Sequence, residues 1–314
     1  RADRTTNPDG TPRWQALNWG RGTMEFYGFA LRPSDPNQLI GGTQDNGVQR
    51  RTAAGGHTFD ITNSTADGGH VAYKQDNPDI VLSEYQHAAV YYSTDGGATW
   101  ARARGIRGAA AFIAPLTNDP IMHNIFYVGT NQVYRSRDDG VNFVDLDGPD
   151  IGALTAITVA NFTINPPQNI RPIYVGSLNG QVARSRDDGA SWQNTARLFE
   201  GNIPPVGNIA VAQRDNNNDR VFVAMQGFSG NAAPPFQRVF YSDNNGDAWT
   251  DISGTLPNAP VNDIRLHPDK NNILFVATDV GVFIGVVNFN NRTAHWARYG
   301  IGLPTVPVTR LSIS

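Results

Sequence analysis

Ser93-Thr94-Asp95-Gly96-Gly97-Ala98-Thr99-Trp100 is a stretch that recurs three more times, with variations, along this chain of 314 residues. The other copies occupy residues 136–143, 185–192 and 242–249, and the four copies start 43, 49 and 57 residues apart. Serine and aspartate side chains accept hydrogen bonds from nearby backbone N–H groups, glycine supplies a positive φ, and the aromatic residue begins the next strand. Because short strand-like runs flank each copy, we predict that each is the turn of a β-hairpin. Their recurrence predicts a stack of four-stranded units.

The repeated turn resembles the Asp-box, or BNR, repeat of the β-propellers of the sialidase, sortilin and xyloglucan-hydrolase type. The resemblance covers nearly the whole chain and implies the fold, which hosts many unrelated activities. We interpret the acidic residues of the repeat as turn caps rather than catalytic groups, because satisfying backbone donors explains their positions. The residues assigned to this structural turn are Ser93, Asp95, Gly97, Trp100, Ser136, Asp138, Gly140, Phe143, Ser185, Asp187, Gly189, Trp192, Ser242, Asn244, Gly246 and Trp249.

The composition favours strands and turns over helices. Only three Glu and two Lys occur beside 25 Asp and 23 Arg, and Gly numbers 32 and Pro 20. A chain this poor in two strong helix formers is expected to be all-β. We predict one propeller domain over residues 1–314, with an irregular segment at 1–13. The opening Arg1-Ala2-Asp3-Arg4 contains neither an initiator Met nor a signal peptide, so we expect a piece of a longer polypeptide.

Charge and composition narrow the classes of partner. The net charge of −3 offers no general attraction to nucleic acid, and no apolar stretch approaches the ~20 residues that span a bilayer. The chain contains no Cys, which excludes disulfides and thiolate metal sites, and its six His residues show no metal-ligand spacing. We therefore expect no nucleic-acid partner, no membrane span, no metal and no cofactor. The family resemblance implies an extracellular, periplasmic or cell-surface location.

One aromatic residue is expected in each outer strand, so these residues predict the number of blades. They are Trp14, Phe59, Trp100, Phe143, Trp192, Trp249 and Trp296, which predicts seven four-stranded antiparallel blades. The third blade supplies the template, with strands A to D expected at 109–115, 125–130, 133–136 and 143–146. The seventh blade is predicted to be incomplete, or closed by the terminal strands Trp14–Leu17 (D) and Val308–Ile313 (A). Its missing strands would come from sequence beyond Ser314, from a partner strand, or not exist.

In a propeller the B–C turns lie at the end opposite the repeated C–D turns, and ligands usually bind at that end. Amides and carboxylates dominate these B–C turns, and they suit hydrogen bonding to sugar hydroxyls or exposed peptide backbone. Tight hairpins also require such residues, and both interpretations stay open. A 12-residue insertion, Gln226–Gln237, is expected between strands B and C of the fifth blade. The predicted ligand-binding rim consists of Gln44, Asp45, Asn46, Gln86, His87, Asn131, Gln132, Asn179 and Asp279.

The candidate catalytic acids are Asp45, Asp279 and Glu84. Asp45 and Asp279 match the aspartate of the Thr-Asp-x-Gly-Gly segment of xyloglucan-degrading hydrolases, in which that residue acts as a catalytic carboxylate. Both positions lack the doubled glycine, and the family places its second carboxylate in a second propeller. Glycoside cleavage needs two carboxyls about 5 to 10 Å apart. The Arg-Ile-Pro segment typical of sialidases does not occur.

These observations favour a non-catalytic, extracytoplasmic recognition or scaffold propeller that binds a glycan or a protein at the B–C/D–A end. The alternative is a glycoside hydrolase, xyloglucanase- or sialidase-like, that uses Asp45 and a second carboxylate. A third possibility is an assembly subunit whose open seventh blade pairs with a partner strand.

Overall fold

The computed structural model describes residues 2–6, 12–14, 25–51, 60–63, 66–164, 170–198, 203–215, 217–228, 237–300, 302–303 and 305–313. Six four-stranded antiparallel sheets dominate this part of the chain, and each follows the simple order first to fourth strand. The first three sheets contain β3 (Phe26–Arg32), β4 (Asp35–Thr43), β5 (Gly47–Arg51) and β6 (Asp60–Asn63); β7 (Gly68–Tyr73), β8 (Val81–Tyr85), β9 (Ala89–Ser93) and β10 (Ala101–Arg102); and β11 (Leu116–Asn118), β12 (Phe126–Gly129), β13 (Val133–Ser136) and β14 (Val144–Asp145). The last three contain β15 (Leu154–Val159), β16 (Ile173–Ser177), β17 (Val182–Ser185) and β18 (Gln193–Asn194); β19 (Val206–Gln213), β20 (Asp219–Met225), β21 (Val239–Ser242) and β22 (Thr250–Asp251); and β23 (Val261–His267), β24 (Lys270–Thr278), β25 (Gly281–Asn288) and β26 (Thr293–Arg298).

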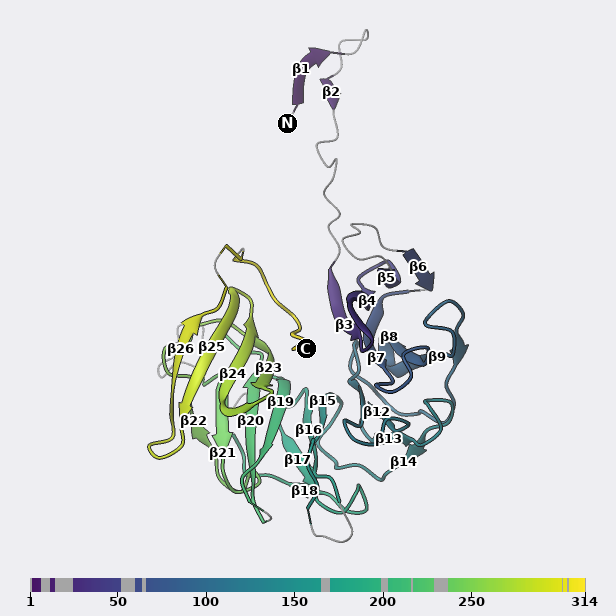
Figure 1. Cartoon of the computed structure of the whole chain (residues 1–314). Helices are drawn as coiled ribbons and strands as arrows, with labels where there is room; N and C mark the ends of the chain where they lie inside the picture. Colours follow the sequence, from purple (N-terminus) through teal and green to yellow (C-terminus); the bar gives the residue numbers. More distant parts are fainter. Residues whose placement is uncertain are drawn as a thin grey trace.

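The sheets are arranged around an axis like blades, as Figure 1 shows. The first strand of each sheet contacts the first strand of the next, from β3 through β7, β11, β15 and β19 to β23. The first strands therefore surround the axis and the fourth strands lie outside, which is the arrangement of a β-propeller. The predicted all-β class and the four-stranded antiparallel blades are confirmed. Among the described residues, no helix is long and apolar enough to cross a membrane.

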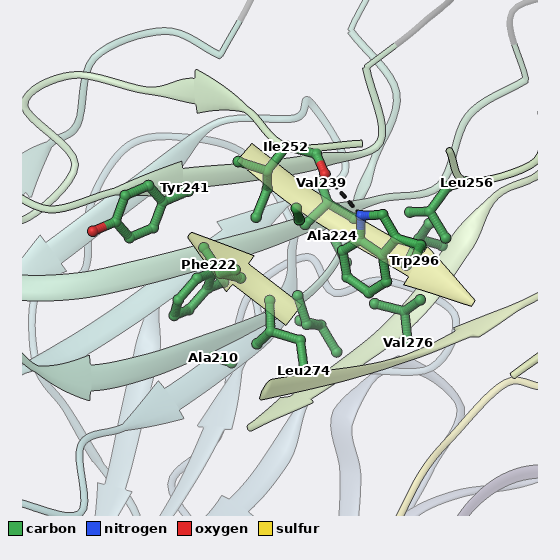
Figure 2. Packing of buried hydrophobic residues seen from close by; sticks show 14 residues of the cluster. Ala210, Phe222, Ala224, Val239, Tyr241, Ile252, Leu256, Leu274, Val276 and Trp296 are labelled. Atoms are coloured by element: carbon green, nitrogen blue, oxygen red, sulfur yellow. Dashed lines mark hydrogen bonds between the residues drawn. The ribbon is translucent and has the colours of Figure 1, made fainter. Parts of the chain in front are cut away.

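The core lies between successive sheets rather than inside any one of them. Figure 2 shows the cluster between the fifth and sixth sheets, which includes Phe222 and Tyr241 of the fifth and Leu274 and Val276 of the sixth. Trp296 of β26 lies in the same cluster with 8% of its surface exposed, and its indole N–H donates to the Ile252 carbonyl at 2.8 Å. Each sheet thus needs apolar residues on both faces, which explains strands with continuous rather than alternating burial.

The repeated turn holds itself together with local hydrogen bonds. The Ser93 hydroxyl donates to Asp95 Oδ1 at 2.7 Å and accepts from the Gly97 N–H at 2.8 Å. Asp95 Oδ1 also accepts from the Ala98 and Thr99 N–H groups, and Oδ2 accepts from the Thr99 hydroxyl at 2.6 Å. These donors, the Thr99 hydroxyl foremost, lower the pKa of Asp95 to about 2. The turns centred on Asp138, Asp187 and Asn244 repeat the serine contacts.

The first strand of the third blade lies later than its predicted range. The strand β11 is Leu116–Asn118, whereas the sequence predicted strand A at 109–115. In the structure this earlier run is the connection from the second blade. The Phe112 carbonyl accepts from the His87 N–H, and the Ala114 N–H donates to the Glu84 carboxylate, so neither group is paired in a strand ladder. The run packs Ala111 and Ala114 into the interior but leaves Phe112 exposed, so its apolar residues do not form a strand.

The two ends of the chain differ from the predicted seventh blade. The strands β1 (Ala2–Thr6) and β2 (Pro12–Trp14) pair with each other, in a segment predicted to be irregular. Residues 15–17 of the predicted D strand, and the marker Phe59, lie outside the described residues. Val308–Ile313 forms no ladder strand, but its backbone reaches the sixth blade through the bond from Val308 N–H to the Thr278 carbonyl. The described residues therefore contain six complete blades, and a seventh stays a prediction.

Candidate functional site

The order of the strands separates two ends of the propeller. In each sheet the A–B and C–D turns lie at one end of the strands, and the B–C turns and D–A connections lie at the other end. Asp95 lies between β9 and β10, a C–D turn, whereas Asp45 lies between β4 and β5, a B–C turn. The structure thus places these two residues at opposite ends of the strands of their sheets.

Asp45 lies in a turn that the second blade helps to hold. Its φ is +59°, and its backbone N–H donates to Asp67 Oδ1 at 2.5 Å. The amide of Gln86 donates to Asp67 Oδ2 at 2.7 Å, so one carboxylate joins the B–C turns of the first and second blades. Close approach makes this contact possible, since a Cβ on Gly68 would lie 2.3 Å from the Gly47 carbonyl oxygen. Sequence reasoning missed Asp67, because only the packing of the blades brings it to Asp45.

Aromatic side chains lie beside these polar turns. Phe112 is 48% exposed and meets His87 edge to face at 5.7 Å and Tyr27 at 6.3 Å between ring centroids. Burial raises the pKa of Tyr27, and the charges of Asp67, Glu25 and Asp45 raise it further. Phe112 was missed because its run was assigned to a strand. We call the following set the rim cluster: Tyr27, Asp45, Asp67, Gln86, His87 and Phe112.

Glu84 is fully buried and cannot reach a ligand at the rim. Its Oε1 accepts from the Ala88 N–H at 3.2 Å and from the Ala114 N–H at 3.1 Å. Burial raises the pKa of the Glu84 carboxyl well above its usual value, against backbone donors that favour the charged form. Glu84 therefore braces the turn that presents His87, whose φ is +59°, and the connection that presents Phe112.

The remaining predicted rim residues occupy B–C turns as expected, but they do not form one cluster. Asn46 donates to the Gln44 carbonyl within the turn of Asp45. The amide of Asn179 bonds to the Ile151 carbonyl of the neighbouring connection. Asp279 accepts from the Asn262 amide at 2.9 Å in the sixth blade. Asn131 and Gln132 occupy the turn between β12 and β13.

Two cavities of about 280 Å³ each lie along the axis and share His70, Thr155 and Arg310 in their walls. The one nearer the rim is lined by residues of the rim cluster and by amides, among them Tyr27 and Phe112, Gln226 and Asn262. Arg310 comes from the C-terminal segment and was expected only as a strand residue. Among the described residues, no group of three or more His, Cys, Asp or Glu side chains could hold a metal ion.

The comparisons with known proteins agree with this architecture. The chain is 25% identical over 247 residues to a xyloglucanase of Hypocrea jecorina (strain QM6a), a match that covers 77% of this chain and 26% of that protein. An ancestral GH74 enzyme is similar in structure, with a TM-score of 0.63 and 18% identity over 86% of this chain and 40% of that one. YCF48 bound to D1 peptide gives a TM-score of 0.58 and 14% identity over 88% and 83% of the two chains. No protein-family model matches.

These likenesses show the fold and leave the activity open. The chain spans about a quarter of the length of the curated relative and two fifths of the ancestral enzyme. The similarity to the two solved structures is structural, at sequence identities below one fifth. What the two solved structures and this chain have in common is the propeller-like fold.

Proposed function

We propose that this propeller is a non-catalytic recognition or scaffold module, outside the cytoplasm, that holds a glycan or a protein partner at the B–C/D–A end. The single observation that carries the proposal is the complete burial of Glu84, the candidate acid with a raised pKa. A general acid must reach the bond it protonates. Glu84 is fully buried and its carboxylate holds the backbone of the rim instead.

The rim cluster supplies what a recognition surface needs. Phe112 offers an exposed ring that can stack on a pyranose or receive an apolar side chain. Gln86 and the carboxylates of Asp45 and Asp67 offer acceptors and donors beside that ring. Hydrogen bonds between neighbouring blades hold the Gln86 amide and the Asp67 carboxylate, so these two side chains lose little freedom on binding, which favours affinity. The peptide seen on YCF48 supports a protein partner, and the xyloglucanase relative supports a glycan.

The decisive experiment measures binding and cleavage together on the whole chain. Soluble xyloglucan and a panel of immobilised extended peptides serve as probes, with reducing-end release measured in the xyloglucan samples. We expect one of these probes to bind, no reducing ends above background, and a loss of binding of about tenfold or more in Phe112→Ala. The matched control is Val144→Ala, an exposed apolar residue in the outer strand of the third blade, which leaves binding unchanged. Absence of binding to every probe, or equal binding by both variants, contradicts the proposal.

A second candidate function is glycoside hydrolysis by Asp45 with Asp67 as the second carboxylate. The observation in its favour is the contact between these residues at the rim, together with the similarity to a xyloglucanase. The same assay separates the two functions. Reducing-end release that falls at least a hundredfold in both Asp45→Asn and Asp67→Asn replaces the recognition proposal with this one.

A further inference from the structure

The two axial cavities are lined by two arginines and a histidine, and by no carboxylate among the described residues. His70, Arg265 and Arg310 are the Lys, Arg and His residues in their walls, and no Asp or Glu contributes to either lining among the described residues. Asp263 is the acidic partner of both arginines, with Arg265 Nε at 3.2 Å and Arg310 Nη1 at 4.0 Å from its carboxylate. One carboxylate therefore faces two guanidinium groups, which leaves the site one positive charge in excess.

Asp263 has little acceptor capacity left for Arg310. The carboxylate is fully buried and accepts from the Asn208 amide, from the N–H groups of Ile264 and Leu311, and from Arg265. Two carboxylate oxygens offer about four acceptor sites, so these four donors occupy them. Arg310 is thus the cation whose charge is least compensated, although only 17% of its side chain is exposed.

His70 orients Arg310 without neutralising it. His70 Nδ1 lies 2.7 Å from the Ala114 carbonyl oxygen, which can only accept, so Nδ1 carries the proton. The ring nitrogen Nε2 is then the acceptor for Arg310 Nη2. Burial and the charge of Arg310 lower the pKa of His70 well below its usual value, which keeps the ring neutral. The guanidinium is thus held by a neutral acceptor, and Arg310 lines both cavities.

We propose that Arg310 binds the carboxylate of an acidic sugar residue, a uronic acid, that enters the axial cavity from the rim. A buried cation without a full counter-charge is costly, and a planar guanidinium fork matches a carboxylate. A single negative charge cancels the excess, whereas a phosphate dianion exceeds it. The cavity wall places the rings of Tyr27 and Phe112 beside the amides of Gln226 and Asn262, which suits a pyranose face and its hydroxyls. This inference rests on the proposed recognition function and names its ligand.

The test uses the whole chain and three small probes: methyl β-D-glucuronide, methyl β-D-glucoside and N-acetylglycine. The first two differ only at C6, where the glucuronide has a carboxylate and the glucoside a hydroxymethyl group. The third carries the kind of carboxylate found at the C-terminus of a peptide. Titration calorimetry is expected to give at least tenfold tighter binding of the glucuronide than of either other probe. Arg310→Gln is expected to weaken glucuronide binding at least tenfold, and Arg310→Lys, which keeps the charge but loses the fork, to weaken it by a smaller factor. Arg137→Gln, an exposed arginine of the opposite end, is the matched control and leaves binding unchanged.

Each contrary outcome has a separate meaning. Equal affinity for the glucuronide and the glucoside, or unaltered binding by Arg310→Gln with an unchanged circular dichroism spectrum, overturns the inference. N-acetylglycine binding as tightly as the glucuronide overturns the assignment to a sugar in favour of a peptide carboxylate. If one of these contrary outcomes is found but Phe112→Ala still weakens binding of xyloglucan or peptide, the recognition proposal stands and only this inference fails.

Discussion

The four repeated turns contain a natural comparison that leads to a double-mutant prediction. In three of them an aspartate faces a donor side chain four residues later: Thr99, Asn142 or Ser191. The fourth turn has Asn244 in place of aspartate and Ala248 in place of the donor. The amide of Asn244 thus has no donor side chain opposite it, and its Oδ1 keeps the bonds to the Ser242 hydroxyl and the Ala248 N–H. The two positions are therefore matched within each turn.

Asp95→Asn places an amide N–H₂ group against the Thr99 hydroxyl. A hydrogen bond to a charged group contributes about 1.5–3 kcal/mol when buried, and exposure at this turn reduces the figure to about 1 kcal/mol. We expect Asp95→Asn to lower the free energy of unfolding by about 1 kcal/mol, Thr99→Ala by about 0.5 kcal/mol, and the double variant by about 1 kcal/mol. The coupling between the two residues is then about 0.5 kcal/mol.

The same substitution removes a pH dependence. The folded-state pKa of Asp95, about 2, lies below its usual value of 3.8, so the charged form is favoured in the folded chain. Its contribution to stability is full above about pH 4 and is lost as the pH falls towards 2. Asp95→Asn lacks this contribution at every pH, so the difference from wild type shrinks in acid.

Urea denaturation followed by tryptophan fluorescence measures both effects, at pH 7 and between pH 2 and 4. The converse pair, Asn244→Asp with Ala248→Thr, serves as the control and is expected to gain about 0.5 kcal/mol over the sum of its single variants. Strict additivity in the first pair, or an Asp95→Asn chain as stable as wild type, refutes the assigned role of these hydrogen bonds.

Three further predictions concern buried groups. Trp296→Ala is expected to lower the free energy of unfolding by about 3–5 kcal/mol, because it leaves a cavity in the cluster of Figure 2. The exposed Val286→Ala is expected to change it by less than about 0.5 kcal/mol. Equal urea midpoints for the two variants contradict the packing. Gly68→Ala is expected to cost about 1–3 kcal/mol in the same assay, since its Cβ would lie 2.3 Å from the Gly47 carbonyl oxygen; wild-type stability speaks against the close approach of the first two blades. The folded-state pKa of Glu84 is raised above 4.5, so the folded chain keeps this proton to a higher pH than the unfolded chain, and stability falls as the pH rises from about 4.5 towards that pKa. Glu84→Gln is expected to flatten the dependence of the melting temperature on pH between pH 4 and 8. An unchanged pH dependence excludes Glu84 as its source.

Much of the fold could be read from local sequence. The turn of Ser93 and Asp95 depends on hydrogen bonds between residues two to four apart, so its residue types are enough to predict a hairpin. The strands on either side of the third-blade turn, predicted at 133–136 and 143–146, lie within a residue of their predicted bounds for the same reason. The first strand of the third blade was misplaced, because an apolar run predicts burial equally well for a strand and for a packed connection.

The candidate site depended on the tertiary structure. The B–C turn of Asp45 could be recognised from its own residues, but its partner Asp67 is 22 residues away and reaches it only because glycine contacts let two blades approach closely. Arg310 and His70 are separated by 240 residues and meet at the axis. Hairpin turns are determined by bonds within a few residues, and so the sequence by itself determined the blades and the end at which each turn lies. Which side chains from different blades share a cavity follows from the radial packing of the whole ring, and only the tertiary structure decided that.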